Sequence, residues 1–185
     1  MTRKRLFDLA LLLPLAPLFV AVTGLLALLV RVVDGGPVFF RQPRVGAGGR
    51  EFTVWKLRTM TCEPDVAARR PTRLGRWLRQ RGLDELPQLF NVLRGDMSLV
   101  GPRPLTPTDA ARLTALHPPF AARFAVAPGL TGLAQVCLAQ GAALTGELDA
   151  AYVRTRSAAL DLQILLRTAW MNLVGKRRGA MPRPT

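Results

Sequence analysis

The most apolar part of the chain lies near its start, where residues 9–30 include no charged side chain. A straight helix of this length would reach about 33 Å, enough to cross the hydrocarbon core of a bilayer, which is roughly 30 Å thick. The pattern therefore predicts a membrane helix. We expect residues 1–33 to form a membrane-inserted segment, residues 34–175 a domain at the membrane surface, and residues 176–185 a basic, flexible tail.

The prolines and flanks of this segment bear on its topology. Pro14 and Pro17 lie inside the apolar run, where each removes a backbone hydrogen bond and bends the helix. Lys4 and Arg5 precede the run and further arginines follow it, whereas a spanning helix usually has its excess of positive charge on one side. Two topologies stay open: a helix that spans the bilayer, and the re-entrant helix that we expect, which bends back so that both flanks face the cytoplasm. Asp8 lies one turn from Lys4 and Arg5 and is expected to pair with either at the membrane interface.

Beyond the apolar run, the pattern changes to short segments typical of strands, turns and helices. Two strand-like segments, residues 37–42 and 51–57, flank the glycine-rich residues 46–49 and predict a β-hairpin. The polar residues 61–72 predict a loop. Stiff turns are predicted at 101–104 and 128–132, and helices at 73–81, 84–94, 108–116, 149–156 and 158–174.

The predicted helix at 73–81 is basic and amphipathic. Leu74, Trp77 and Leu78 share one of its faces, which either rests on lipid while the arginines meet headgroups or packs in an ordinary core. The sequence thus predicts an α+β fold that is mostly helical. Its N-terminal re-entrant membrane helix is followed by a small membrane-associated domain with a β-hairpin and amphipathic interfacial helices.

The charge of the chain narrows the classes of partner. It has 26 basic residues against 12 acidic ones, which gives a formal net charge of +14. Such a charge indicates nucleic acid, an anionic membrane surface or a phosphate-rich substrate. We expect no nucleic-acid partner, because no nucleic-acid-binding motif is present and aromatic residues do not alternate with the basic ones. Cys62 and Cys137 lie far apart, so the sequence predicts neither a disulfide framework nor a cysteine metal site, and it suits a reducing compartment.

Two adjacent carboxylates are the strongest candidates for chemistry. Asp84 and Glu85 begin a predicted helix, with Asp84 as its N-cap, near the positive end of the helix dipole. Arg79 and Arg103 are close in sequence, and nearby positive charge lowers the pKa of a carboxylate and keeps it ionised, as a nucleophile requires. The same helix end and arginines would hold phosphates. The alternative interpretation is an ordinary helix cap in a solvated cluster of charges.

The segment around the carboxylates is long and distinctive: LDELPQLFNVLRGDMSLVGPRP occupies residues 83–104. It resembles the bacterial sugar transferase family, the monotopic polyprenyl-phosphate phosphoglycosyl transferases, in their small single-domain form. Other segments share the resemblance, so that it runs along most of the chain. They are KRLFD at residues 4–8, GPVFFRQ at 36–42, KLRTM at 56–60, PGLTG at 128–132 and LDLQIL at 160–165.

The resemblance implies an enzyme, a phosphoglycosyl transferase. Such an enzyme moves a sugar-1-phosphate from a UDP-sugar to undecaprenyl or another polyprenyl phosphate, giving polyprenyl diphosphate-sugar and UMP through a phosphosugar-aspartyl intermediate. This is the first membrane step of glycan assembly, whether of exopolysaccharide, O-antigen or a glycoprotein glycan. The resemblance also implies a bacterial inner membrane protein with its active site on the cytoplasmic face, in contact with an anionic membrane surface.

The resemblance assigns roles to individual residues. Asp84 would be the nucleophile, and Glu85 would help to bind Mg²⁺ or position the donor. The residues expected to contact substrate phosphates are Lys56, Arg58, Arg79 and Arg103. The residues expected to anchor the membrane helix are Lys4, Arg5, Asp8, Pro14 and Pro17.

The chain also departs from the family pattern. Ala127 stands where an arginine is usual, Leu133 where a tryptophan is usual, and residues 137–139, Cys-Leu-Ala, where Asn-Gly-Arg is usual. These replacements bear on sugar recognition, and they keep a second function open: a non-catalytic, membrane-bound homologue that binds lipid phosphate or a partner protein. The sequence does not name the sugar, the lipid length or the pathway, and it leaves the oligomeric state open, a homodimer included.

Overall fold

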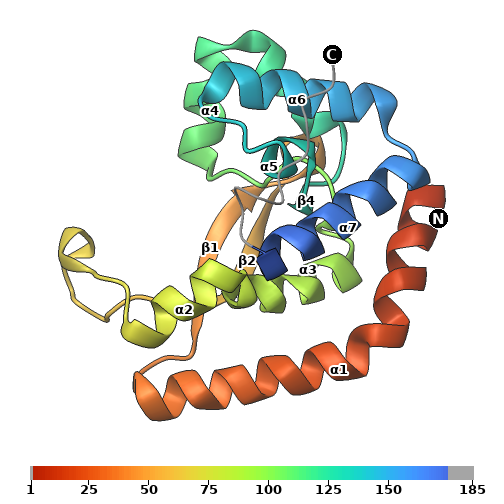
Figure 1. Cartoon of the computed structure of the whole chain (residues 1–185). Coiled ribbons are helices and arrows are strands. Elements are labelled where there is room, and N and C mark those ends of the chain that lie inside the picture. The colour runs from red at the N-terminus through yellow and green to blue at the C-terminus, as the bar shows by residue number, and fades with distance from the viewer. Residues whose placement is uncertain (1, 175–185) are drawn as a thin grey trace.

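The computed structural model describes residues 2–174 (Figure 1). The predicted tail at 176–185 lies outside these residues. The helices are α1 Arg3–Val33, α2 Arg73–Arg81, α3 Leu89–Arg94, α4 Pro107–Leu116, α5 Leu133–Val136, α6 Ala142–Thr155 and α7 Ala158–Val174. The strands are β1 Phe39–Val45, β2 Glu51–Leu57, β3 Ser98–Val100 and β4 Gly129–Thr131. Short 3-10 helices occupy η1 Ala47–Gly49, η2 Val66–Ala68, η3 Leu83–Gln88 and η4 Pro118–Ala125.

Helix α1 is long, apolar and bent. Figure 1 shows a short N-terminal arm meeting a longer arm that runs along the lower edge of the domain. Both Pro14 and Pro17 lie within the helix, so two backbone hydrogen bonds are missing there. By length and composition α1 could cross a membrane, and only 17% of its most apolar window is buried against the rest of the protein. The bend is what a re-entrant helix requires.

The predicted β-hairpin is confirmed. Strands β1 and β2 pair antiparallel, in a register that runs from Phe39 opposite Leu57 to Val45 opposite Glu51. The first strand starts and ends later than the predicted 37–42. The tip between the strands contains Gly48, whose φ of 64° lies in the left-handed region that glycine adopts without strain.

A second, smaller sheet is formed by segments far apart in the sequence. Strands β3 and β4 pair in parallel, with Ser98 opposite Gly129. The backbones approach so closely that a Cβ on Gly129 would lie 2.0 Å from the amide nitrogen of Gly101. Only glycine fits at such a contact. The segments predicted as turns at 101–104 and 128–132 therefore lie side by side.

Two predicted helices differ from the structure. The helix predicted at 84–94 is a 3-10 helix, η3, followed by α3, which begins only at Leu89. Pro87 has no amide hydrogen to continue an α-helical ladder. The prediction that Asp84 is the N-cap is wrong: Gly82 holds that position in the left-handed conformation and also ends α2. The helix predicted at 149–156 already begins at Ala142.

Helix α2 divides its apolar face between core and solvent. Leu78 is fully buried in a small cluster with Leu26 of α1 and Leu57 of β2. Trp77 remains 39% exposed, beneath the guanidinium of Arg81 at 4.9 Å. Core packing therefore accounts for one side of this helix. Like Trp77, several apolar side chains of α3 and α7 are exposed: Phe90, Leu162, Leu166, Trp170 and Leu173.

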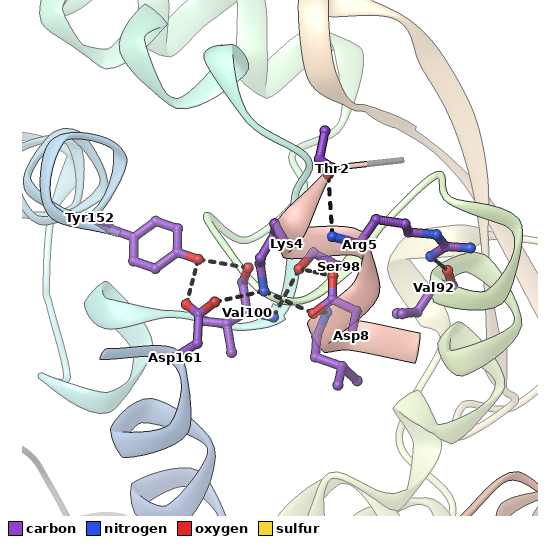
Figure 2. A network of polar contacts seen from close by, with 10 residues as sticks. Thr2, Lys4, Arg5, Asp8, Val92, Ser98, Val100, Tyr152 and Asp161 are labelled. Carbon is purple, nitrogen blue, oxygen red and sulfur yellow. Dashed lines mark hydrogen bonds and ion pairs between the residues drawn. The ribbon is translucent and has the colours of Figure 1, made fainter. Parts of the chain in front are cut away.

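A buried polar network joins the first turns of α1 to the domain (Figure 2). Lys4 Nζ lies 2.8 Å from Asp8 Oδ1 and 2.9 Å from Asp161 Oδ2. Ser98 Oγ donates to Asp8 Oδ2 at 2.7 Å, and the Tyr152 hydroxyl lies 2.7 Å from Asp161 Oδ1. Asp8 thus pairs with Lys4, as predicted, but it is 2% exposed and lies against β3 inside the protein.

The second basic residue of this turn has a different partner. Arg5 donates to the backbone carbonyls of Val92 and Leu93, at the C-terminal end of α3 (Figure 2). Those carbonyls lie at the negative end of the helix dipole, where a positive charge is stabilising. Lys4, Arg5 and Asp8, predicted as membrane anchors, therefore fix α1 to β3, α3 and α7.

We expect Asp8→Ala to destabilise the fold by about 3 kcal/mol, because removing one partner of a buried ion pair leaves the other charge poorly compensated. Thermal and urea unfolding in a nonionic detergent would measure the change. Glu63→Ala, which removes an exposed carboxylate from the 61–72 loop, is the control and should change stability by less than about 0.5 kcal/mol. Equal stability of the two variants would contradict the assignment of Asp8 to a buried junction.

Candidate active site

The two candidate carboxylates lie where three segments meet. Asp84 and Glu85 occupy the first turn of η3, immediately after the left-handed Gly82 that ends α2. Strand β2 packs against η3, which brings Lys56 to this turn. The turn after β3 brings Arg103 from the other side. The structure thus places these four predicted side chains close to one another.

Glu85 is held between two cations. Its Oε1 atom lies 2.6 Å from Lys56 Nζ and 2.6 Å from Arg103 Nη2. Burial alone would raise the pKa of Glu85, but the charges and hydrogen bonds of Arg103 and Lys56 outweigh it and lower the pKa to about 2. Glu85 is therefore ionised throughout the physiological range. In return, Glu85 raises the pKa of Arg103 above its ordinary value and outweighs the opposite effect of partial desolvation.

Asp84 has the opposite electrostatic character. Its side chain is buried, and the residue is only 8% exposed. Burial and the neighbouring charge of Glu85 raise its pKa, and together they outweigh the attraction of Lys56 and Arg79 and a backbone hydrogen bond. Arg79 acts in the expected direction, but the net shift is upward, so the sequence expectation of a lowered pKa for Asp84 is wrong. The two adjacent carboxyl groups differ in proton affinity, a pattern typical of sites that give paired acids different roles.

The other two predicted phosphate ligands are placed differently. Arg79 Nε donates to Thr59 Oγ1 at 2.7 Å, and the guanidinium is near enough to Asp84 to lower its pKa. Arg58 is 9% exposed and donates to the backbone carbonyls of Asp34 and Gly35, where α1 ends. Arg58 thus holds the connection between α1 and β1, whereas Arg79 belongs to the surroundings of Asp84.

Comparison with known proteins decides the family. The family model described as "Bacterial sugar transferase" matches residues 1–175 of the chain. The chain belongs to the bacterial sugar transferase family.

Several curated relatives of this bacterial sugar transferase carry substrate names. A Caulobacter vibrioides protein named UDP-glucose:undecaprenyl-phosphate glucose-1-phosphate transferase is 47% identical over 90% of this chain and 68% of its own length. A Komagataeibacter xylinus protein named undecaprenyl-phosphate glucose phosphotransferase is 44% identical over 91% of this chain but only 35% of its own length. The Bacillus subtilis sugar transferase EpsL is 42% identical over 95% of this chain and 90% of its own length. The chain thus spans between about a third and nine tenths of these relatives.

The departures from the family pattern fall mostly on packing positions. Leu133 and Cys137 are each 5% exposed and belong to the main hydrophobic core, not to an open donor pocket. Leu138 has a φ of 51°, the one positive value among the non-glycine residues that the structure describes. This transferase therefore has a leucine in a conformation that favours the glycine usual in its family.

Sequence reasoning missed a buried ion pair that contacts the site. Arg123 of η4 and Asp149 of α6 lie 3.3 Å apart, and Arg123 also donates to the backbone carbonyl of Arg103. Nothing in the spacing of these residues points to the pair, because 26 positions and several turns separate them. The only local signal is an arginine among apolar residues at 120–126.

We predict that Glu85 makes stability depend on pH in the acid range. Because the folded-state pKa is depressed to about 2, the contribution is fully present above the unfolded value of about 4.5 and is lost as pH falls toward 2. Wild-type protein should lose about 2 kcal/mol from this residue between pH 6 and pH 3. Urea unfolding of wild type and Glu85→Gln across that range would measure it.

The Glu85→Gln variant should be less stable than wild type at pH 7, with a gap that narrows by about 2 kcal/mol at pH 3. Glu63→Gln, at an exposed position in the 61–72 loop, is the control and should follow the wild-type curve. A gap that stays constant with pH would show that Lys56 and Arg103 do not lower the pKa of Glu85.

Proposed function

We propose that this protein transfers a sugar-1-phosphate from a UDP-sugar to undecaprenyl phosphate, giving undecaprenyl diphosphate-sugar and UMP. The observation that carries the proposal is a buried Asp84 beside Glu85, with Lys56, Arg79 and Arg103 around them. The names of the Caulobacter and Komagataeibacter relatives support the substrate classes. An Aeromonas hydrophila relative, 37% identical, is named for N-acetylgalactosamine, so the family accepts more than one sugar.

The arrangement suits a double displacement. A carboxylate oxygen of Asp84 attacks the β-phosphorus of the donor, the bond from this phosphorus to the bridging oxygen breaks, and UMP leaves. The resulting acyl phosphate holds the phosphosugar on the enzyme. An oxygen of undecaprenyl phosphate then attacks the same phosphorus and restores the Asp84 carboxylate. Two easier displacements replace one difficult step, which is the advantage of a covalent nucleophile.

The basic residues supply charge where the phosphates would lie. Arg103 is about half exposed and can exchange one of its contacts with Glu85 for a phosphate oxygen. Lys56 lies on the opposite side of the same carboxylate. Lys56 and Arg79 also act against burial and Glu85 by lowering the pKa of Asp84, which favours its ionised, nucleophilic form.

Magnesium fits this site as a companion of the donor. Among the described residues no group of three or more histidine, cysteine or acidic side chains is placed to hold a metal ion. Mg²⁺ commonly binds through one or two carboxylates together with substrate phosphates, and Glu85 with the donor diphosphate would provide such a set. Bound there, it would neutralise diphosphate charge and stabilise the departing UMP.

The surface of the protein supports a place at the cytoplasmic face of the bacterial inner membrane. The long arm of α1 exposes many apolar side chains, and those of α2, α3 and α7 add to them. Basic residues flank α1 on both sides. A bent helix that enters and leaves the same leaflet would keep Asp84 on the side where UDP-sugars are found.

We predict that Asp84→Asn abolishes transfer without loss of the fold. The amide removes the nucleophilic charge, so release of UMP and formation of lipid-linked product should fall to background, at least about 1,000-fold below wild type. Because burial disfavours the charged form of Asp84, thermal stability should be equal or higher. Assays would combine purified protein, undecaprenyl phosphate, Mg²⁺ and a panel of UDP-sugars.

Mass spectrometry of protein mixed with UDP-sugar and Mg²⁺ alone adds a direct test. Wild type should gain the mass of one phosphosugar on the peptide containing Asp84, and Asp84→Asn should not. Asp109→Asn, the same change on an exposed aspartate, is the control and should retain full activity. Substantial product formation by Asp84→Asn would mean that the lipid phosphate attacks the donor directly.

We predict that both ends of α1 face the cytoplasm. Single cysteines would be introduced as Arg3→Cys and Pro37→Cys, both at exposed positions, in a Cys62→Ser background. An impermeant thiol reagent should label both sites in opened vesicles and neither in intact cells. Labelling of Arg3→Cys from outside intact cells would establish a spanning helix instead.

A further inference from the structure

The backbone that carries Arg103 is fixed from outside its own turn. Four successive carbonyls, from Pro102 to Leu105, each accept a hydrogen bond from a different donor. The donors are the Gly129 amide, Arg123 Nη2, Arg44 Nη1 and the Val45 amide, in that order. Residues 102 and 104 are prolines without amide hydrogens, so the turn cannot form a ladder of its own.

The donor to the Arg103 carbonyl is the most deeply buried of these side chains. The side chains of Arg123 and Asp149 are 3% and 2% exposed, and their Nη2 and Oδ2 atoms lie 3.3 Å apart. A buried ion pair of this kind is costly to desolvate, and apolar residues of similar volume often stabilise a fold as well or better. A contribution to the stability of the fold therefore does not explain why an ion pair occupies this position.

Surrounding residues leave the Arg123 guanidinium little freedom. Its Cζ atom lies 4.5 Å from the centre of the Phe120 ring, which is itself buried. That ring rests on Gly146 of α6 so closely that a Cβ there would lie 2.7 Å from Phe120 Cδ2. Helix α6 and η4 thus hold the guanidinium between an aromatic face, a carboxylate and the Arg103 carbonyl.

We infer that Arg123, held by Asp149, is a positioning residue for Arg103. The Arg103 side chain is about half exposed, so its aim toward Glu85 and the donor phosphate depends on where its backbone is fixed. Arg123 fixes that backbone at the residue itself. The kinetic consequence rests on the transfer reaction proposed above, whereas the placement of Arg103 does not.

The test uses an apolar replacement of the whole pair. Arg123→Met combined with Asp149→Leu keeps similar volume and removes the donor to the Arg103 carbonyl without leaving a buried charge unpaired. We expect it to retain the wild-type melting temperature within a few degrees but to lose about 10-fold in kcat/KM, since small displacements of a catalytic group are costly. Arg123→Gln, assayed below its melting temperature, serves if the double variant does not fold.

A double-mutant cycle with Arg103→Ala separates positioning from a general structural role. If Arg123 acts through Arg103, replacing the pair in the Arg103→Ala background should lower kcat/KM by less than about 2-fold. A further 10-fold loss in that background, or wild-type kcat/KM in the folded double variant, would overturn the inference. Arg112→Gln, which breaks an exposed ion pair of α4, is the control and should leave activity unchanged.

A spectroscopic measurement decides the placement without relying on transfer. In ¹⁵N-arginine-labelled protein, the guanidinium signal of Arg103 is assigned by its loss in Arg103→Lys. Replacement of the pair should move this signal toward that of free arginine, because the contacts with Glu85 become transient. An unchanged signal would overturn the inference, and absence of UMP release by wild type would instead count against the proposed function.

Discussion

The Glu85 carboxylate is the point on which the candidate site depends. It lies between Lys56 of β2 and Arg103 of the turn after β3, so one ion cluster joins three segments of the chain. The cluster also adds to the effect of burial on the proton affinity of its neighbour, Asp84. Glu85 is held ionised by two cations, and its negative charge then raises the pKa of the buried Asp84. A phosphate group that drew Arg103 or Lys56 away from Glu85 would change this balance, and with it the proton affinity of Asp84.

The apolar helix α1 and the candidate site are connected through buried polar contacts. Asp8 near the start of α1 accepts a hydrogen bond from Ser98, the first residue of β3. The turn that carries Arg103 follows directly after β3. An apolar helix lying in lipid has few specific contacts that fix its angle, whereas ion pairs and hydrogen bonds have defined geometry. The network of Figure 2 therefore sets the angle at which α1 leaves the domain.

Local signals explain which parts of the fold could be predicted. The apolar run of α1 is long, the two hairpin strands flank glycines, and α2 is bounded by the cap Thr72 and the left-handed Gly82, so all three were recognised from sequence. The start of α6 was not, because Gly141 offers no side-chain cap. The β3–β4 pair was missed since its strands have three residues each and meet across a long separation.

The site shows the same division between local and long-range information. The family resemblance predicted that Lys56, Glu85 and Arg103 belong to one site. In the structure, Lys56 and Arg103 both contact Glu85. The upward shift of the Asp84 pKa could not be predicted from the neighbouring residues in the sequence. Burial is its largest cause, and burial arises only on folding. Arg58 was expected at phosphate, but its guanidinium reaches the carbonyls that end α1. The sequence identified the candidate groups, and tertiary packing determines their electrostatics and the contacts that hold them.

One face of α6 supports both ends of the segment that carries Arg103. Asp149 and Tyr152 are three positions apart, which places them on the same side of the helix. Tyr152 reaches the Val100 carbonyl and Asp161, the partner of Lys4, while Asp149 holds Arg123 against the Arg103 carbonyl. Both contacts converge on β3 and its turn. A shift of α6 would therefore move the attachment of α1 and the aim of Arg103 together, although α6 contributes none of the groups placed around Asp84.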